Sequence, residues 1–118
     1  MNGRIFKLKA EISRSLQEQW TVAKMAAAAD LSEPHFIRLF RTEIKTTPFE
    51  YLTCLRMEQA KNLLENTFLR IKEIGVNVGI PNESQFSREF RKRFSLTPTE
   101  YRHRHWEIEQ SNPPDVQE

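Results

Sequence analysis

The sequence contains little cysteine and little glycine. Cys54 is the single cysteine, so no disulfide can form within the chain and no cysteine-rich metal site can be assembled. The three glycines form no phosphate-cradling loop, which argues against a nucleotide-dependent enzyme. No apolar run approaches the roughly 20 residues that span a bilayer, and the N-terminus lacks the apolar segment of a signal peptide. We therefore expect a cytoplasmic protein without membrane contact, metal, cofactor or catalytic site.

Charge is nearly balanced over the chain but unevenly distributed. The formal net charge is +2, and residues 107–118 contribute −4, which leaves +6 on residues 1–106. Six basic side chains stand between positions 88 and 104, against two acidic ones: Arg88, Arg91, Lys92, Arg93, Arg102 and Arg104. A basic stripe on an otherwise balanced domain is typical of a protein that binds a polyanion.

The chain repeats itself. FIRLFRTEIKTTPFEY begins at Phe36 and FSREFRKRFSLTPTEY begins at Phe86, and eight of the sixteen positions match at an offset of 50. Upstream, Asp30-Leu31 corresponds to Gly79-Ile80 at an offset of 49, so one residue is inserted in the second copy just before its second helix. A period of this length indicates one supersecondary unit used twice.

Local signals predict helices between short turns. Thr21 and Ser32 are expected to cap two helices, with Pro34 in the first turn of the second. Asn82 with Gln85 resembles a capping box. Asp30 and Gly79 are expected in the turns, because both residue types tolerate left-handed dihedrals. Pro48 opens a long helix to about Asn66 that joins the two units.

Each unit has a last helix with two distinct faces. An apolar stripe predicts the core: Phe36, Leu39 or Phe40, and Ile44 in the first, and Phe86, Phe90 and Phe94 in the second. The opposite faces are Pro34, Ile37, Arg38 and Arg41 in the first unit, and Ser84, Ser87, Arg88 and Arg91 in the second. Serines allow close approach to a major groove and arginine can bond guanine O6 and N7, whereas Ile37 suits a thymine methyl and His35 a phosphate or base edge. These arginines could simply form a solvated face, but their paired occurrence favours binding.

Other candidate sites are interpreted as structural. Cys54 is expected to be a buried thiol, because no histidine is near it in sequence. Arg56 is expected to have a structural role, paired with a carboxylate inside the fold. His103 and His105 are expected to be solvated or near phosphate rather than bound to metal.

At these motifs the sequence resembles the DNA-binding domain of the AraC/XylS family of bacterial transcription regulators. The resemblance covers roughly residues 5–104. It rests on the run from Met25-Ala26 to Phe40-Arg41, the pattern Tyr51-Leu52…Leu55-Arg56…Ala60…Leu63-Leu64, and IKEIGVNVGIPNESQFSREFRKRFSLTPTEYR from Ile71 to Arg102.

The resemblance implies an all-α fold of about seven helices. It places an AraC-type DNA-binding domain over residues 1–106, with two helix-turn-helix units (5–47 and 70–104), each a homeodomain-like three-helix subdomain, and a linking helix (48–66). Residues 107–118 are expected to be an acidic, disordered tail. The two recognition helices would enter successive major grooves about 34–36 Å apart.

The resemblance also assigns roles by position. Base contacts would come from Pro34, Ile37 and Arg38 in the first unit, and from Glu83, Ser84, Ser87 and Arg88 in the second. Arg41, Arg91 and Lys92 would hold phosphates. Double-stranded DNA is the expected partner and RNA polymerase a second candidate; the isolated domain would be monomeric and a longer protein could dimerise through an N-terminal domain.

The sequence departs from the family pattern at four positions. Lys45 and Ser95 stand where the family usually has glycine, Gly75 replaces the usual alanine, and Ile80 the usual phenylalanine. Two alternatives to a transcription regulator stay open at this point. One is the DNA-binding part of an adaptive-response DNA repair protein. Such proteins need a zinc-bound cysteine cluster, which a single cysteine cannot supply. The other is a helical module that binds proteins.

Overall fold

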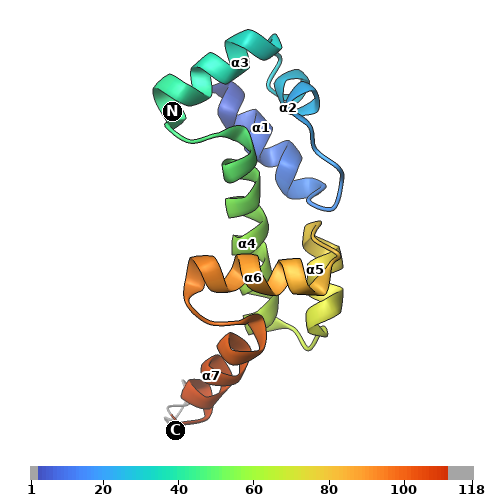
Figure 1. The fold of residues 1–118 in the computed structure, drawn as a ribbon, viewed down its shortest axis with the longest axis vertical. Helices are drawn as coiled ribbons and strands as arrows, with labels where there is room; N and C mark the ends of the chain where they lie inside the picture. Colours follow the sequence, from blue (N-terminus) through green and yellow to red (C-terminus); the bar gives the residue numbers. More distant parts are fainter. Residues whose placement is uncertain (1–2, 112–118) are drawn as a thin grey trace, which may run out of the picture. The chain divides into compact units, whose positions relative to one another are not determined.

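The described part of the chain is helical. The computed structural model describes residues 3–111, without the side chains of 109–111, and these residues form seven α-helices, one π-helical turn and no strand (Figure 1). In chain order they are α1 (Gly3–Arg14), α2 (Val22–Ala28), α3 (Glu33–Leu39), the π turn η1 (Phe40–Ile44), α4 (Pro48–Asn66), α5 (Ile71–Val78), α6 (Glu83–Phe94) and α7 (Pro98–Ser111). The predicted all-α fold of about seven helices is confirmed. None of these helices has the length and apolar character that crossing a membrane requires.

The chain divides into two compact units within α4, a helix that runs without a break in Figure 1. Unit 1 ends at Arg56 and unit 2 begins at Met57. The linking helix was expected over the same residues as α4, but it is more than a connector. Its first part contributes Leu52 and Leu55 to the core of unit 1, and its second part contributes Met57, Ala60 and Leu64 to the core of unit 2.

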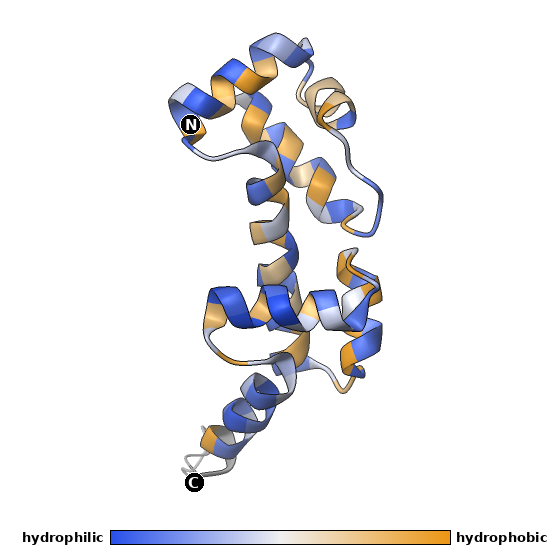
Figure 2. Ribbon diagram, viewed as in Figure 1, coloured by the Kyte–Doolittle hydropathy of each residue, from blue (hydrophilic) through white to orange (hydrophobic). Residues whose placement is uncertain are grey.

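Each unit is built around a pair of phenylalanines from the last helix of its helix-turn-helix element. Phe36 and Phe40 are buried in unit 1 with ring centroids 4.8 Å apart, and Phe86 and Phe90 in unit 2 with centroids 6.2 Å apart. Figure 2 shows hydrophobic positions alternating with hydrophilic ones along α3 and α6, as expected for helices with one buried face. Burial of one such aromatic side chain contributes about 2–3 kcal/mol. These pairs therefore fix which face of each helix is left outside.

The turns of the two helix-turn-helix elements have the same hydrogen bonding. Asp30 and Gly79 have φ values of 63° and 94°, which confirms them as left-handed turn residues. The following N–H closes each turn onto the preceding helix, with N···O distances of 2.9 Å from Leu31 to Ala26 and 2.8 Å from Ile80 to Gly75. This pattern satisfies carbonyl groups that the helix end would leave free.

The one-residue insertion lies at Pro81. Leu31 and Ile80 occupy the same place after the left-handed residue, whereas the next helix is capped by Ser32 in unit 1 and by Asn82 in unit 2. Pro81 is therefore the extra residue between the turn and the cap. Both caps are the predicted ones, and so is Thr21 at the start of α2; of the predicted capping box at Asn82, the structure shows the bond from Gln85 N–H to the Asn82 side chain.

The last helix of each helix-turn-helix element also ends on a left-handed residue. Lys45 has φ 65° and Ser95 has φ 68°. A residue with a Cβ costs about 1 kcal/mol there relative to glycine. Unit 1 differs in its final turn, where Lys45 N–H reaches Phe40 O at 2.6 Å in a π-type bond. The hydroxyl of Thr42 donates to Arg38 O at 3.0 Å, a local competition that distorts helices.

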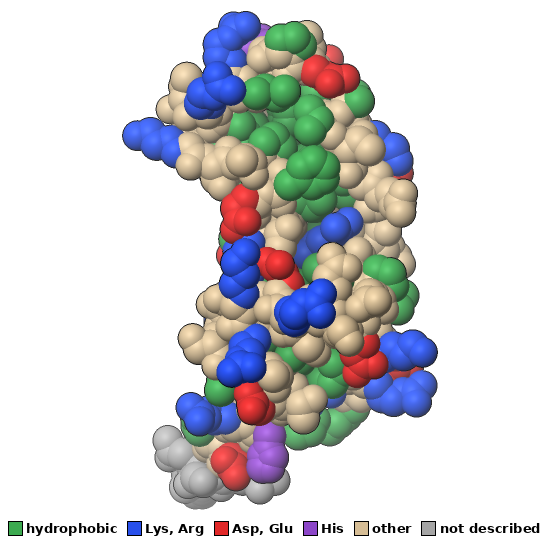
Figure 3. All heavy atoms as spheres, in the orientation of Figure 1, with side chains coloured by type: hydrophobic (Ala, Val, Ile, Leu, Met, Phe, Trp, Pro, Cys, Tyr) green, Lys and Arg blue, Asp and Glu red, His purple; other side chains and the backbone are tan. Residues whose placement is uncertain are grey.

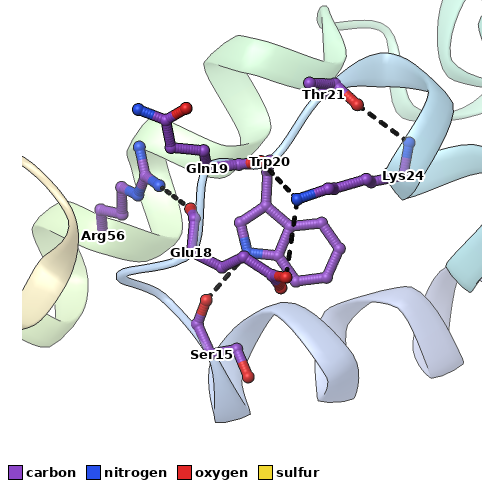
Figure 4. A network of polar contacts seen from close by, with 7 residues as sticks. All are labelled: Ser15, Glu18, Gln19, Trp20, Thr21, Lys24 and Arg56. Atoms are coloured by element: carbon purple, nitrogen blue, oxygen red, sulfur yellow. Dashed lines mark hydrogen bonds and ion pairs between the residues drawn. The ribbon is translucent and has the colours of Figure 1, made fainter.

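In unit 1 a polar network holds the segment between α1 and α2 (Figure 4). Arg56 Nε donates to Leu16 O at 3.1 Å and Nη2 to Glu18 O at 2.9 Å. The indole of Trp20 donates to Ser15 O at 2.9 Å, so the half-buried ring has its polar atom satisfied. The structural role predicted for Arg56 is therefore confirmed, but the predicted partner was wrong: the guanidinium binds backbone carbonyls and not a carboxylate.

The C-terminal helix is longer than expected. α7 continues to Ser111, so the first five residues of the tail predicted from position 107 are helical and that boundary was wrong. The acidic composition of these residues predicted a tail, but they continue the helix that begins at Pro98. That helix starts with a reciprocal cap: Thr97 N–H donates to Glu100 at 2.9 Å, and Glu100 N–H donates to Thr97 Oγ1 at 3.1 Å. The remainder of the predicted tail, residues 112–118, lies outside the described residues.

The tight turn of unit 2 gives a stability prediction for Gly75. A Cβ added there would lie 2.7 Å from the carbonyl oxygen of Ile80 and 3.5 Å from the ring of Phe86. Overpacking of this kind costs about 1–3 kcal/mol, more than the roughly 1 kcal/mol that alanine gains in helix propensity. We expect Gly75→Ala to lower the free energy of unfolding measured in urea. Gly3→Ala, with nothing within 4 Å of its Cβ, is the control and should not destabilise; equal effects would contradict the tight turn.

Candidate nucleic-acid interface

The recognition helix of unit 1, α3 with η1, exposes the face predicted to bind DNA. Ser32 caps the helix by accepting a hydrogen bond from the N–H of His35 at 3.4 Å, and Pro34 stands in the first turn. One surface pocket is lined by Glu33, Pro34, Ile37, Arg38 and Arg41. Phe36 and Phe40 lie in the core on the opposite side of the helix, so this face is left exposed to solvent in unit 1.

The recognition helix of unit 2, α6, exposes a more polar face. Asn82 Oδ1 accepts a hydrogen bond from Gln85 N–H at 2.8 Å and so caps the helix. The exposed predicted contact residues are Glu83, Ser84, Arg88, Arg91 and Lys92. Ser87, the remaining predicted contact on this helix, is half-buried. In Figure 3, Lys and Arg side chains project from the surface over both α3 and α6.

The basic stripe predicted for residues 88–104 is only partly available to a ligand. Arg93 is paired with Glu89 at 3.2 Å, and only 18% of its side chain is exposed. Arg102 is engaged with backbone carbonyls of its own unit. The exposed members of the stripe are Arg88, Arg91, Lys92 and Arg104. Three of these four lie on α6, which concentrates the available charge on the recognition helix.

Arg102 holds the segment between α4 and α5. Its guanidinium donates to the carbonyls of Leu64, Leu69 and Thr67 at 3.1, 2.5 and 3.1 Å, and to Leu63 at 3.4 Å. The group also lies over the ring of Trp106, 5.1 Å from its centroid. Burial lowers the pKa of Arg102 from its ordinary value, as it does for Arg56. Each unit therefore uses one arginine to bind carbonyls at or just after the end of a helix, which is α1 for Arg56 and α4 for Arg102.

A second polar contact in unit 2 joins α7 to α4. The hydroxyl of Tyr101 donates to the carboxylate of Glu65, and the tyrosine ring stacks on His105 with centroids 6.4 Å apart. Burial, followed by the hydrogen bond to Glu65, raises the pKa of Tyr101 to about 12. The phenol therefore remains a donor at neutral pH, and this tyrosine acts in the scaffold.

Two other candidate residues, Cys54 and His103, lie on α4 and α7. Cys54 is half-buried in α4, so the expectation of a fully buried thiol was wrong in degree. His103 is exposed and lies 3.9 Å from Glu107, a contact between two solvated side chains. Within residues 3–111, no group of three or more His, Cys, Asp or Glu side chains could hold a metal ion.

Sequence reasoning missed one cation on the unit 1 face. Lys45 lines a second pocket together with Ile37 and Arg41, which also line the first one. A basic residue where the family usually has glycine is the signal that could have identified it.

Known proteins resemble this chain in sequence and in fold. A family model described as a helix-turn-helix domain matches residues 25–104. The RCS-specific transcriptional activator RclR of Escherichia coli (strain K12) is 37% identical over 101 residues, which is 83% of this chain and 36% of that protein. The chain spans about a third of the length of the curated relatives it matches.

Two solved structures share the fold over nearly their whole length. One is an AraC-type transcriptional regulator from Chromobacterium violaceum, with a TM-score of 0.80, 25% identity, and coverage of 94% of this chain and 95% of that one. The other is the DNA-binding domain of the global transcriptional factor AdpA in complex with a target DNA, with a TM-score of 0.79, 26% identity, and coverage of 95% and 97%.

Arg102 and Arg104 of α7 give a test that distinguishes an arginine that stabilises the fold from one on the surface. Arg102→Met removes hydrogen bonds to four carbonyls, and we expect a loss of about 2–3 kcal/mol in the free energy of unfolding. Arg104→Met alters an exposed side chain and should change stability by no more than about 0.5 kcal/mol. Urea titrations followed by circular dichroism measure both. If both variants unfold at the same midpoint as the parent, Arg102 does not hold the segment.

Proposed function

Because the chain belongs to the AraC-type family of helix-turn-helix DNA-binding domains, we propose that it binds double-stranded DNA sequence-specifically and regulates transcription. The exposed faces of α3 and α6 would each enter a major groove. The observation that carries the proposal is the matched pair of faces: Arg38 and Arg41 in unit 1 recur as Arg88 and Arg91 in unit 2, in each case opposite a buried phenylalanine pair. A solvated surface alone would not require the same arginines on both helices.

The two faces are proposed to contribute unequally to recognition of the DNA sequence. In unit 2, Arg88 can bond guanine O6 and N7, and Glu83 can accept from the amino group of cytosine. Ser84 and Ser87 are small and allow the helix to approach the bases. In unit 1, Arg38 is the strongest candidate for a base contact, whereas Pro34 and Ile37 offer shape and apolar contact rather than hydrogen bonds. Unit 2 is therefore proposed to supply most of the sequence specificity.

The remaining exposed cations are proposed to hold the DNA backbone. Arg41, Arg91 and Lys92 lie toward the C-terminal ends of their helices, where contacts to phosphate are expected, and His35 is a further candidate. Phosphate contacts position the protein on DNA without reading its sequence.

The proposal includes the oligomeric state in which the domain binds DNA. Dimeric helix-turn-helix proteins supply one recognition helix per chain, whereas this chain carries two. The isolated domain can therefore bind as a monomer. RNA polymerase is the second proposed partner, because a DNA-bound regulator acts on the polymerase or on its access to the promoter.

Selection of bound sequences from random duplexes, followed by footprinting of the enriched duplex, tests the function. The expected result is an enriched motif with two separate protected major-groove segments. Binding that yields no enriched motif would rule out sequence-specific recognition.

Salt dependence distinguishes DNA binding from the protein-binding alternative. Several phosphate contacts predict that the logarithm of the binding constant falls linearly with the logarithm of salt concentration. A module that binds only proteins would show no such affinity for duplex DNA.

Two arginines of α6 offer a matched pair of variants. Arg88→Ala should relax the preference at one base position and weaken binding to the selected duplex by about 1–3 kcal/mol. Arg91→Ala should instead weaken binding to selected and random duplexes alike and reduce the salt slope by about 1. Fluorescence anisotropy with both duplexes measures the difference. Uniform weakening by Arg88→Ala would reassign that side chain to phosphate.

A further inference from the structure

Lys45 extends the DNA-facing surface of unit 1 beyond the end of its recognition helix. It is exposed, directly follows η1 as its left-handed cap, and lines one pocket together with Arg41. The pocket it lines contains Ile37, Arg41 and the hydroxyl-bearing residues Thr46 and Thr47. Because Ile37 and Arg41 also line the pocket of the predicted recognition face, the two pockets form one continuous surface.

Lys45 occupies a backbone position that favours glycine. Its φ of 65° places it in the left-handed region, where a Cβ is unfavourable. Within the described residues, the ammonium group makes no hydrogen bond or ion pair that would offset this strain. The charge of Lys45 is therefore available to a partner outside the unit.

We propose that Lys45 binds a backbone phosphate of the DNA that unit 1 contacts, an inference that rests on the proposed function. In helix-turn-helix proteins the N-terminal residues of the recognition helix contact base edges, so the C-terminal end of α3–η1 lies nearer the groove wall. A lysine there presents a mobile point charge, which suits a phosphate better than a base edge. The hydroxyl groups of Thr46 and Thr47 beside it are further donors of the kind that contact phosphates.

The proposed contact belongs to unit 1 alone. The equivalent residue in unit 2 is Ser95, which has nearly the same backbone conformation at φ 68° but carries no charge. Lys45 therefore compensates for the weaker hydrogen-bonding capacity of Pro34 and Ile37 on the same unit. Ser95 provides a control in which the backbone strain is matched and the cation is missing.

Four variants separate the charge of Lys45 from its backbone strain. Lys45→Gln removes the charge and keeps the strain, and Lys45→Arg keeps both. Lys45→Gly and Ser95→Gly remove the strain, and each should raise the thermal unfolding midpoint by about 3–5 °C. Binding is measured by fluorescence anisotropy on the selected duplex and on a random-sequence duplex, between about 50 and about 200 mM salt.

The proposal predicts that only Lys45→Gly changes stability and affinity in opposite directions: it should unfold at a higher temperature and bind DNA more weakly than the parent chain. Lys45→Gly and Lys45→Gln should weaken binding to both duplexes and reduce the salt slope by about 0.9, so their disadvantage shrinks about three- to fourfold across the salt range. Lys45→Arg and Ser95→Gly should bind like the parent chain.

Two results would overturn the inference, and they are distinguishable. If the parent binds duplex DNA with a salt-dependent affinity and Lys45→Gln binds equally well with the same slope, Lys45 is no phosphate contact and the proposed function stands. If the parent itself shows no salt-dependent DNA binding, the proposed function fails and this inference fails with it.

Discussion

The structure depends on the burial of one phenylalanine pair in each unit. Phe36 with Phe40, and Phe86 with Phe90, are fully enclosed, and each pair fixes the rotation of its recognition helix about its own axis. Arg38 and Arg88 stand two positions from both rings of their pair, which places them on the opposite side of the helix. The exposure of Arg38, Arg41, Arg88 and Arg91 is thus a consequence of core packing. A smaller core residue would loosen the orientation of the face as well as the stability of the unit.

The two units solve the same local problems with different residues. The left-handed turn uses Asp30 in one and Gly79 in the other, and Pro81 lengthens only the second. In both, an arginine binds carbonyls at or just after the end of a helix, yet Arg56 and Arg102 do not align in the repeat. The scaffold is therefore repeated while the exposed faces have diverged.

Local features of the fold were predictable from the sequence because their causes are local. The caps at Thr21, Ser32 and Asn82, the turn residues and the phenylalanine stripes each depend on a few neighbouring residues. Arg102 was misjudged as part of a free basic stripe because its partners are 33 to 39 residues away. Only folding brings those carbonyls to it. The roles of individual side chains on DNA remain predictions, since they depend on a partner's atoms.

The central claim is that the exposed faces of α3 and α6 are the surface that meets DNA. Titration of the isotope-labelled chain with the selected duplex, followed by amide chemical shifts, tests it most directly. The account predicts that the largest changes fall on residues 33–45 and 83–95, with little change around Phe6 on α1 or Phe68 before α5. Large changes around Phe68 and Trp106, with both recognition helices unaffected, would contradict it.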